Sequence, residues 1–324
     1  GGLRNMDGRA EFDIVIAGGG MVGASLAVAL AGLPLRILVV EATPPADAAQ
    51  PSYDDRATAI SESSRRILQG IGCWEELAFA AAPIRSIHVS ERGAFGVTRL
   101  HAAEHGLASF GCVVENRALG QVLWHRLEGA PGVTIWAPAR VAGVEQDGGE
   151  VTVRVEQADG TETRVSARLL VAADGARSPT RALAGIAQET RDYQQVAVIA
   201  NLTPAVDHGG TAFERFTSSG PLAVLPLTQG RATIVWTLPP DQAETVMALD
   251  DSAFLAEFQL AFGYRLGLFR KVGRRAGYPL SLVQATAWHA GRVTLAGNAA
   301  HGIHPVAGQG FNLGLRDAAA LAEL

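Results

Sequence analysis

The sequence predicts an α/β protein with two parts: a Rossmann-like dinucleotide-binding domain built on a mixed sheet, and a discontinuous α+β domain built on an antiparallel sheet. Three segments predict the first part: a strand–glycine turn–helix unit near the N-terminus, a second apolar strand ending in Asp-Gly, and a glycine-rich run at residues 292–317. Four strand-like runs between residues 195 and 237, broken by glycines and Pro204, predict the second part.

The N-terminal unit begins with residues 12–17 (FDIVIA), an apolar run rich in β-branched residues that is typical of a buried parallel strand. It leads into a G-x-G-x-x-G turn formed by Gly18, Gly20 and Gly23 and then into a helix over 24–31. A second strand at 36–40 ends at Glu41, where a carboxylate can accept the ribose hydroxyls of an adenosine. Because Glu41 disfavours a 2′-phosphate, FAD or NAD is expected rather than NADP. The alternative is a glycine-rich turn beside a surface glutamate.

Strands expected over 140–146, 151–157 and 163–171 form a β-meander that leads to the second segment. This segment is residues 169–181 (LLVAADGARSPTR), an apolar strand that ends at Asp174 and Gly175. A second such strand end is not needed to hold one NAD, but it suits a longer cofactor whose pyrophosphate is flanked on both sides. The alternative is an Asp-Gly turn that caps a helix starting near Ser178.

The third segment is residues 292–317 (RVTLAGNAAHGIHPVAGQGFNLGLRD), which predicts a buried strand, a glycine turn, a loop stopped by proline and a helix opening near Gly310. Its glycines Gly308, Gly310 and Gly314 allow the backbone to approach a flat molecule closely. The unpaired N–H groups of the helix start favour an anion or an electron-rich carbonyl.

Together the three segments resemble the FAD-dependent aromatic hydroxylases with a single dinucleotide-binding domain. Residues 304–317 (HPVAGQGFNLGLRD) are similar to the signature of the UbiH-type ring hydroxylases of ubiquinone biosynthesis. The segments at 213–227, 113–123 and 54–61 also resemble that subfamily, and the resemblance runs from about residue 12 to the end.

The resemblance implies an FAD-binding domain made of residues 6–81, 112–190 and 285–324, and a substrate domain made of residues 82–111 and 191–284. The cofactor-binding residues that it implies, with those found above, are Gly18, Gly20, Gly23, Glu41, Arg56, Asn116, Arg117, Asp174, Gly175, Gly297, Asn298, Gln309, Gly310 and Asn312. Asn116 has an alternative interpretation as the N-cap of a helix over 116–127. Pro305, Gly308 and Gly310 are expected around the flavin ring. No side chain is assigned as a base, since His301 and His304 are expected to be loop histidines.

The resemblance also implies the activity: hydroxylation of the aromatic ring of a polyprenylated phenol through a flavin C4a-hydroperoxide, with O2 and with NAD(P)H as a transient co-substrate. The pocket is expected between the flavin and the antiparallel sheet, lined by Phe213, Arg215, Phe216, Leu225 and Pro226. Arg215 is a candidate for binding a carboxylate or phenolate. Its alternative is a surface ion pair with Glu214 or another acid.

Two features depart from the family pattern. Asn298 stands where the family has aspartate, and a neutral hydrogen bond is weaker than a charge-assisted one, so weaker FAD retention is expected. The sequence ends at Leu324 within a run expected to form an apolar helix, and the C-terminal helical tail of related hydroxylases is expected to be largely absent from it. Two other functions therefore remain open: a flavin hydroxylase of a small soluble aromatic, and a flavin-poor scaffold subunit of a quinone-biosynthesis complex.

Charge, cysteine content and the length of apolar runs limit the kinds of molecule that the chain is expected to bind. A net charge of −5 without a dense Lys/Arg block argues against nucleic acid. The two cysteines, Cys73 and Cys112, lack metal-binding spacing, so no metal and a reduced, cytoplasmic location are expected. No apolar run reaches the ~18 residues of a membrane span, which leaves peripheral contact with the inner face of a membrane, or with a multi-enzyme complex, open. Ring position, substrate tail length, NADH versus NADPH and oligomeric state are not encoded in these motifs.

Overall fold

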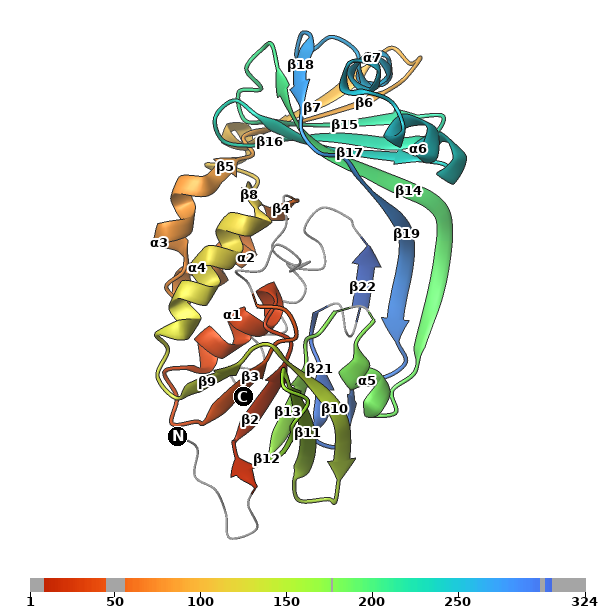
Figure 1. Cartoon of the computed structure of the whole chain (residues 1–324). Coiled ribbons are helices and arrows are strands. Elements are labelled where there is room, and N and C mark those ends of the chain that lie inside the picture. Colours follow the sequence, from red (N-terminus) through yellow and green to blue (C-terminus); the bar gives the residue numbers. More distant parts are fainter. Residues whose placement is uncertain (1–8, 45–55, 176, 298–300, 305–324) are drawn as a thin grey trace.

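The structure is a computed structural model that describes residues 9–44, 56–175, 177–297 and 301–304. Its lower half is built on a six-stranded sheet with the order β20-β21-β13-β2-β3-β9 (Figure 1). These strands are His289–Ala290, Val293–Leu295, Leu169–Ala172, Ile14–Ala17, Ile37–Val40 and Val133–Trp136. The central strands pair in parallel and are buried on both faces, as their continuous apolar sequences predict.

Helices cover one face of this sheet. The helix α1 (Met21–Leu30) packs against α4 (Asn116–Glu128), and both belong to a core that also contains Ile16 and Val39. The short helices α2 (Glu62–Gly70) and α3 (Trp74–Leu77) and the 3-10 turn η2 (Ala78–Ala80) lie on the same side as α4. A further 3-10 turn, η3 (Ala102–His105), lies in the upper half of the molecule instead.

The other face packs on a four-stranded sheet with the order β1-β12-β11-β10, comprising Ala10–Glu11, Glu162–Ala167, Val151–Gln157 and Ala139–Gln146. The sequence predicted one strand over 163–171, and this is wrong. The chain instead makes β12 in the four-stranded sheet and then β13 in the six-stranded one. The switch occurs at Arg168, where the N–H groups of Arg168 and Leu169 both donate to the Asp13 carbonyl (3.1 and 3.2 Å).

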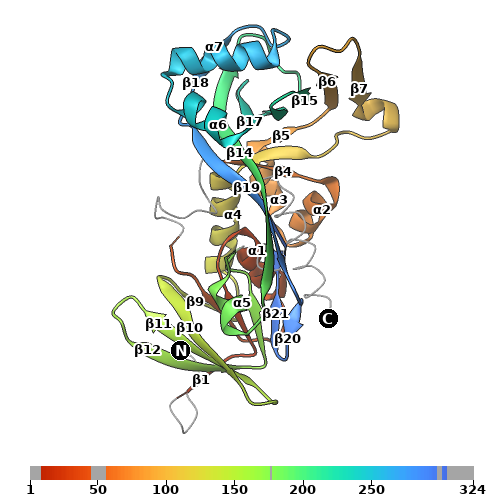
Figure 2. The ribbon, with the colours of Figure 1, turned by 90° about the vertical axis from the view of Figure 1, so that its right-hand side faces the viewer.

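The upper half is a nine-stranded sheet that includes β22-β19-β14-β17-β16-β15-β6-β7 in that order, with β18 paired to β14. The strands are His301–His304, Ala276–Ala285, Gln188–Pro204, Ala232–Leu238, Gly220–Pro226, Thr211–Thr217, Ser86–Glu91, Val97–His101 and Phe269–Val272. The long strands β14 and β19 run from this sheet down to the lower half (Figures 1 and 2). Their pairing shifts register between Asp192 and Val196, where Gln194 has φ 53°.

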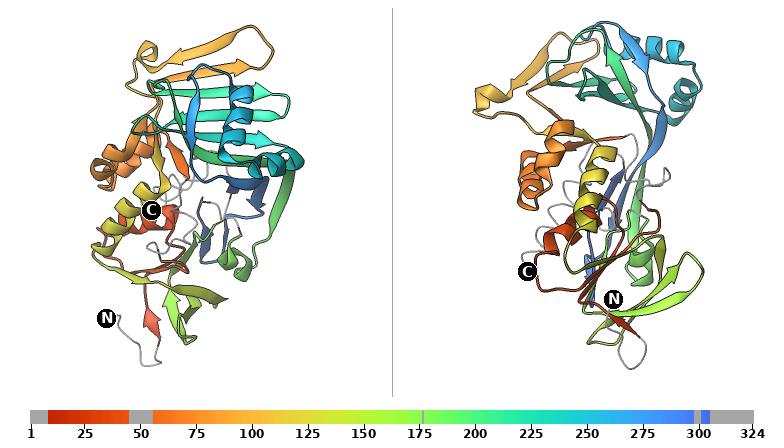
Figure 3. Two further views of the ribbon diagram at one scale, coloured as in Figure 1. Left: turned by 45° about the horizontal axis from the view of Figure 1, so that its top comes forward. Right: turned by 60° about the vertical axis from the view of Figure 1, so that its left-hand side comes forward.

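Two helices, α6 (Pro240–Met247) and α7 (Asp251–Phe262), cover one face of the nine-stranded sheet (Figure 3). Phe254 and Phe258 of α7 are fully buried against Trp236 of β17. We call this side the helix face and the opposite side the inner face. Because side chains alternate along a strand, Val198 and Ala200 lie on the helix face, and Ile199 lies on the inner face.

A three-stranded sheet, β4-β8-β5 (Ala57–Ile60, Cys112–Glu115 and Ala81–Pro83), lies between the two halves. Its Val113 packs with Ile84, Ala212 and Leu227, which ties it to the nine-stranded sheet. The helix α2 that follows β4 is capped by Ser61, whose Oγ accepts from the Ser64 N–H at 3.2 Å.

The predicted fold class, a Rossmann-like α/β domain with a mixed sheet plus an antiparallel sheet, is confirmed. The expectation that His301 and His304 lie in a loop is wrong, because residues 301–304 form β22 and pair with β19. The short helix α5 (Pro179–Leu183) follows β13. Within the described residues, no helix is both long and apolar enough to cross a bilayer.

Candidate functional site

The three motifs come together at the carboxyl ends of the parallel strands. The chain passes from β2 to β3 on one side, whereas β13 lies on the other side of β2, so the strand order reverses between β2 and β13. Such a switch point opens the crevice in which parallel α/β sheets bind ligands. Gly18 and Asp174 follow these two strands, and a Cβ placed on Gly18 would lie only 2.8 Å from the Asp174 Cα. The first two motifs are therefore in direct contact.

The glycine turn is fixed from several sides. A Cβ on Gly23 would lie 1.8 Å from the Gly18 carbonyl oxygen, so the helix can start this close to the turn only with glycine there. The Gly19 N–H donates to Glu41 Oε2 at 3.0 Å. Trp124 Nε1, from α4, donates to the Gly19 carbonyl at 3.0 Å in a buried contact. The sequence did not single out Trp124, because nothing near it in the chain indicates the turn it reaches.

The N-terminus of α1 fits the phosphate groups of a dinucleotide. Its N-cap is Gly20, which provides no side-chain cap, and its first turn contains no acidic residue. The first N–H groups of such a helix attract anions. Glu41 ends β3 beside this turn, where the adenosine of the cofactor is expected. The described residues therefore fit the nucleotide half of FAD.

The carboxylate of Asp174 caps the next helix. Its Oδ2 accepts from the Thr180 N–H (3.2 Å) and Oγ1 (2.7 Å), and its Oδ1 accepts from Ser178 Oγ. This is the alternative that the sequence left open for the Asp-Gly turn. Gly175, at φ 96°, has no described atom within 4 Å of where a Cβ would stand. The role of Asp174 and Gly175 in cofactor binding stays a prediction.

The third motif joins the same crevice. Gly297, at φ 61°, lies against α1, since a Cβ there would be 3.0 Å from Val22 Cγ2. Six predicted residues of this motif lie outside the described residues: Asn298, Pro305, Gly308, Gln309, Gly310 and Asn312. As far as the chain is described, all three motifs meet around the first turn of α1.

Asn116 is not the N-cap of α4. Glu115 occupies that position, and Asn116 is the first helical residue and is buried. Its N–H donates to the Arg56 carbonyl at 2.8 Å, and its Oδ1 accepts from Thr58 Oγ1 at 2.5 Å. The interpretation of Asn116 as a cap is therefore wrong, and the residue instead joins α4 to the start of β4. Arg117 is exposed.

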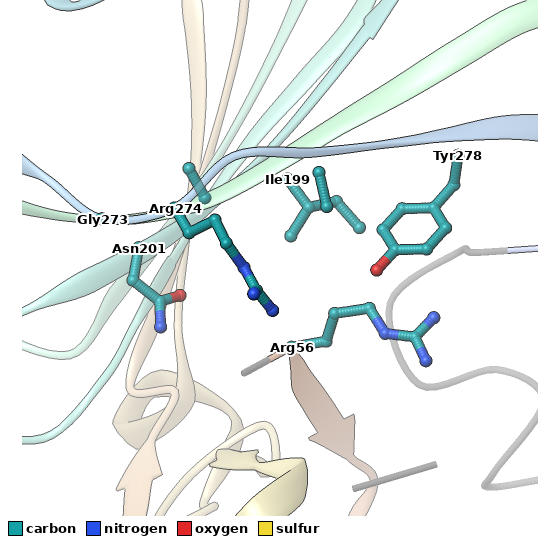
Figure 4. A pocket seen from close by; sticks show the side chains of 8 residues that line it. Arg56, Ile199, Asn201, Gly273, Arg274 and Tyr278 are labelled. Atoms are coloured by element: carbon teal, nitrogen blue, oxygen red, sulfur yellow. The ribbon is translucent and has the colours of Figure 1, made fainter. Parts of the chain in front are cut away.

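A cavity of about 150 Å³ lies between β4 and the inner face of the nine-stranded sheet (Figure 4). Its described lining is Arg56, Ile199, Ala200, Asn201, Gly273, Arg274, Ala276 and Tyr278, and none of these is acidic. The Arg274 guanidinium and the Tyr278 hydroxyl point towards the middle of this lining, whereas the Arg56 side chain extends away from Arg274 and passes below Tyr278. The Arg56 guanidinium lies 4.8 Å from the centroid of the Tyr278 ring.

The predicted pocket residues divide between the two faces of the sheet. Leu225 and Phe216 lie on the inner face, on the side of the cavity. Phe213 and Pro226 lie on the helix face, where Phe213 packs edge-on against Phe262. Sequence reasoning placed a whole segment at the pocket, although alternation in a strand allows only every second residue to face it.

Arg215 lies on the helix face as well. Its Nε donates to the Ala261 carbonyl at 3.1 Å and its Nη1 to Ser90 Oγ at 3.2 Å. The expected ion pair with Glu214 is wrong, because adjacent residues of a strand point to opposite faces. Burial, and then the charges of Arg265 and Arg92, lower the pKa of the Arg215 guanidinium.

Sequence reasoning missed Ile199, Asn201, Arg274 and Tyr278, which line the cavity. The alternation of Val198–Asn201 in β14 offered a signal for two of them. Arg274 follows β18, and nothing local indicates which way it points.

Comparison with known proteins agrees with this arrangement. Residues 11–324 match the family model described as FAD binding domain. The chain is 40% identical over 312 residues to a protein of Rhodospirillum rubrum named ubiquinone hydroxylase UbiL, covering 96% of this chain and 71% of that protein. It is 34% identical to the 3-demethoxyubiquinol 3-hydroxylase of Escherichia coli, covering 96% and 79%. The crystal structure of p-nitrophenol 4-monooxygenase PnpA from Pseudomonas putida DLL-E4 has the same fold, with a TM-score of 0.81, 23% identity and coverage of 97% and 79%.

Proposed function

The chain belongs to the FAD binding domain family and to its aromatic hydroxylases, and we propose that it hydroxylates the ring of a polyprenylated phenol in ubiquinone biosynthesis. The family match covers nearly the whole chain, and relatives at 40% and 34% identity carry the names of ubiquinone hydroxylases. NAD(P)H is the proposed reductant and O2 the oxygen source.

The observation that carries the proposal is the meeting of three motifs that are distant in the sequence. Gly18, Asp174 and Gly297 are brought together at one end of the parallel sheet. An elongated cofactor can lie across such a crevice with its nucleotide at the turn before α1. When bound, FAD supplies the oxygen chemistry, and the chain supplies binding, orientation and a dry site. Glu41 and the first turn of α1 are proposed to hold the nucleotide half.

The cavity suits a single aromatic ring. A volume of about 150 Å³ is the size at which a protein cavity accepts a benzene molecule. Ile199 and Ala276 offer apolar contact, and Arg274, Asn201 and the Tyr278 hydroxyl offer hydrogen bonds. A guanidinium close to a phenol oxygen favours its ionised form, which makes the ring richer in electrons. We therefore assign Arg274 to the ring oxygen of the substrate.

The test is reconstitution with FAD, followed by assay of phenols with and without a prenyl substituent, using NADH or NADPH and isotopically labelled dioxygen. Label in a hydroxylated prenylphenol supports the proposal. Turnover confined to small soluble phenols would move the function to the first alternative. The protein can also be incubated with a high concentration of FAD and then separated from unbound FAD. A visible spectrum without flavin absorption would overturn the enzyme function and favour the scaffold.

We also propose that the protein works in the cytoplasm at the inner face of the membrane, because a polyprenylated phenol partitions into the bilayer. Fractionation of cells that express the chain checks this: activity recovered with washed membranes, or on liposomes that hold the substrate, is the expected result.

A further inference from the structure

The inner face of the nine-stranded sheet carries an apolar surface that the sheet itself leaves partly uncovered. On the helix face, Leu222 and Ile234 are fully buried under α6 and α7. On the inner face, Val235 and Ala223 are only half-buried, Pro221 is exposed, and Phe216 is 45% exposed. Exposed apolar side chains that adjoin one another are candidates for a binding site.

Strand register shows that these side chains form one continuous track. Ile199 of β14 pairs with Val235 of β17, and Val235 pairs with Ala223 of β16. Pro221, two residues from Ala223 and on the same face, pairs with Phe216 of β15. We call Ile199, Val235, Ala223, Pro221 and Phe216 the apolar strip.

The strip starts at the cavity and leads away from it. Ile199 lines the cavity and is 8% exposed, and Val235 lies one strand further from it. Ala223 and Pro221 share the next strand, β16, and Phe216 lies on the strand after that. Three strand spacings separate β14 from β15, so the track extends about 14 Å across the sheet and also steps two residues along β16. The first charged side chain beyond Ala223 in this row is the exposed Glu214, which pairs with it. The strip therefore turns along β16 at Ala223, beside the Glu214 carboxylate, and ends at Phe216.

We propose that the apolar strip binds a linear hydrocarbon substituent of the substrate while the ring occupies the cavity. The inference rests on the proposed function and adds to it the position and chemistry of the second half of the substrate. Ile199 belongs both to the cavity lining and to the strip, so a substituent that leaves the cavity along the sheet meets Ile199 and then Val235. Continuity with the cavity favours this occupant over a second protein.

Direct binding tests the inference without turnover. The FAD-loaded protein is titrated with a phenol that bears no tail and with one that bears several isoprene units, following flavin absorption or fluorescence. Ala223→Glu places a charge in the middle of the strip, and Phe216→Ser removes its far end. For each variant, the dissociation constant of the tailed phenol should rise about tenfold, and that of the tailless phenol by less than about twofold.

Two controls isolate the effect. Phe95→Ser removes an equally large side chain that is fully exposed between β6 and β7, and it should change neither constant. Phe216→Leu should restore most of the preference for the tailed phenol. Flavin absorption and circular dichroism confirm that each variant folds and holds FAD.

The outcomes separate the inference from the function on which it rests. If the strip variants weaken the binding of both phenols equally, or of neither, the role of the strip in binding the tail is overturned, even if hydroxylation continues. Tail-dependent binding that the variants abolish supports the strip even if no phenol is hydroxylated, and the proposed function alone then fails. A change in oligomeric state caused by Ala223→Glu, without a change in tail preference, would instead assign the strip to contact between copies.

Discussion

The indole of Trp124 reaches across 105 residues of sequence to donate its Nε1–H to the Gly19 carbonyl at 3.0 Å. The ring also covers the turn, since a Cβ on Gly19 would lie 2.9 Å from Trp124 Cζ2. Helix α4 thus holds the glycine turn in the shape that a dinucleotide needs. Contacts within the chain that hold the turn reduce the ordering that has to accompany binding.

Replacing Trp124 by phenylalanine should weaken FAD binding by about three- to tenfold, because a hydrogen bond contributes about 0.5–1.5 kcal/mol and the turn becomes looser. The dissociation constant measured by flavin fluorescence checks this. Trp288→Phe, at a side chain that is 57% exposed, is the matched control and should leave the constant unchanged. An unchanged dissociation constant of FAD for Trp124→Phe would mean that the glycine turn keeps its conformation without the indole hydrogen bond.

Arg274→Ala should raise the KM for the phenol about tenfold or more, because hydrogen bonds to charged groups contribute about 1.5–3 kcal/mol. FAD affinity should stay the same, since Arg274 lies on the sheet side of the cavity. Arg270→Ala, at an exposed position on β18, is the control and should change neither quantity. A loss of FAD in the Arg274 variant would reassign the residue to the cofactor.

Asp174→Asn separates two roles of one carboxylate. Loss of charge-assisted bonds to Ser178 and Thr180 should lower the free energy of unfolding by about 1 kcal/mol. Thr180→Val removes the hydroxyl that donates to Asp174 Oδ2 and keeps the carboxylate. This variant should be less stable, with unchanged FAD affinity. Weaker FAD binding in Asp174→Asn alone is the result expected of a cofactor residue, and titration of FAD into both variants measures it.

The two thiols give a pH dependence of stability. Burial raises the pKa of Cys73 to about 11 and that of Cys112 to about 12, above the ordinary value of 9.0. Between pH 9 and 11 the unfolded chain therefore binds fewer protons than the folded chain, and the stability contributed by the neutral thiols is lost as pH rises. Urea denaturation at pH 8 and 10 should show a lower stability at pH 10, with a smaller drop in Cys73→Ala. A thiol reagent at pH 8 should label both cysteines only after unfolding, because the thiolate is the reactive form.

Asn298→Asp tests the departure from the family sequence. A carboxylate forms stronger hydrogen bonds with hydroxyl groups than an amide oxygen does, so FAD affinity should rise about three- to tenfold. The ratio of bound flavin to protein after gel filtration reports the change. Equal retention by both forms would show that the amide serves equally well.

The sequence predicted most elements of the nucleotide-binding half, since residues 14–17 and 37–40 form strands where apolar runs meet glycines. It failed at residues 163–171, because one continuous strand pattern does not reveal that the chain changes sheets at Arg168. Sequence reasoning named Arg215 and not Arg274 as a pocket residue, because Arg215 belongs to the segment 213–227 that resembles the UbiH-type hydroxylases. Which face of the sheet a side chain occupies depends on strand register, and the resemblance does not give that register. Trp124 escaped notice because its partner is distant in the chain.

The ribbon formed by β14 and β19 has a mechanical consequence. Both strands pass from one half of the protein to the other without a linker, and Gln188–Ala285 and Ile199–Ala276 are pairs of the same ladder. Cutting the chain between the halves would divide the β14–β19 ladder and leave strand edges without hydrogen-bond partners on both pieces. Neither half is therefore a separable module, and heat or denaturant should melt nucleotide crevice and ring cavity in a single transition.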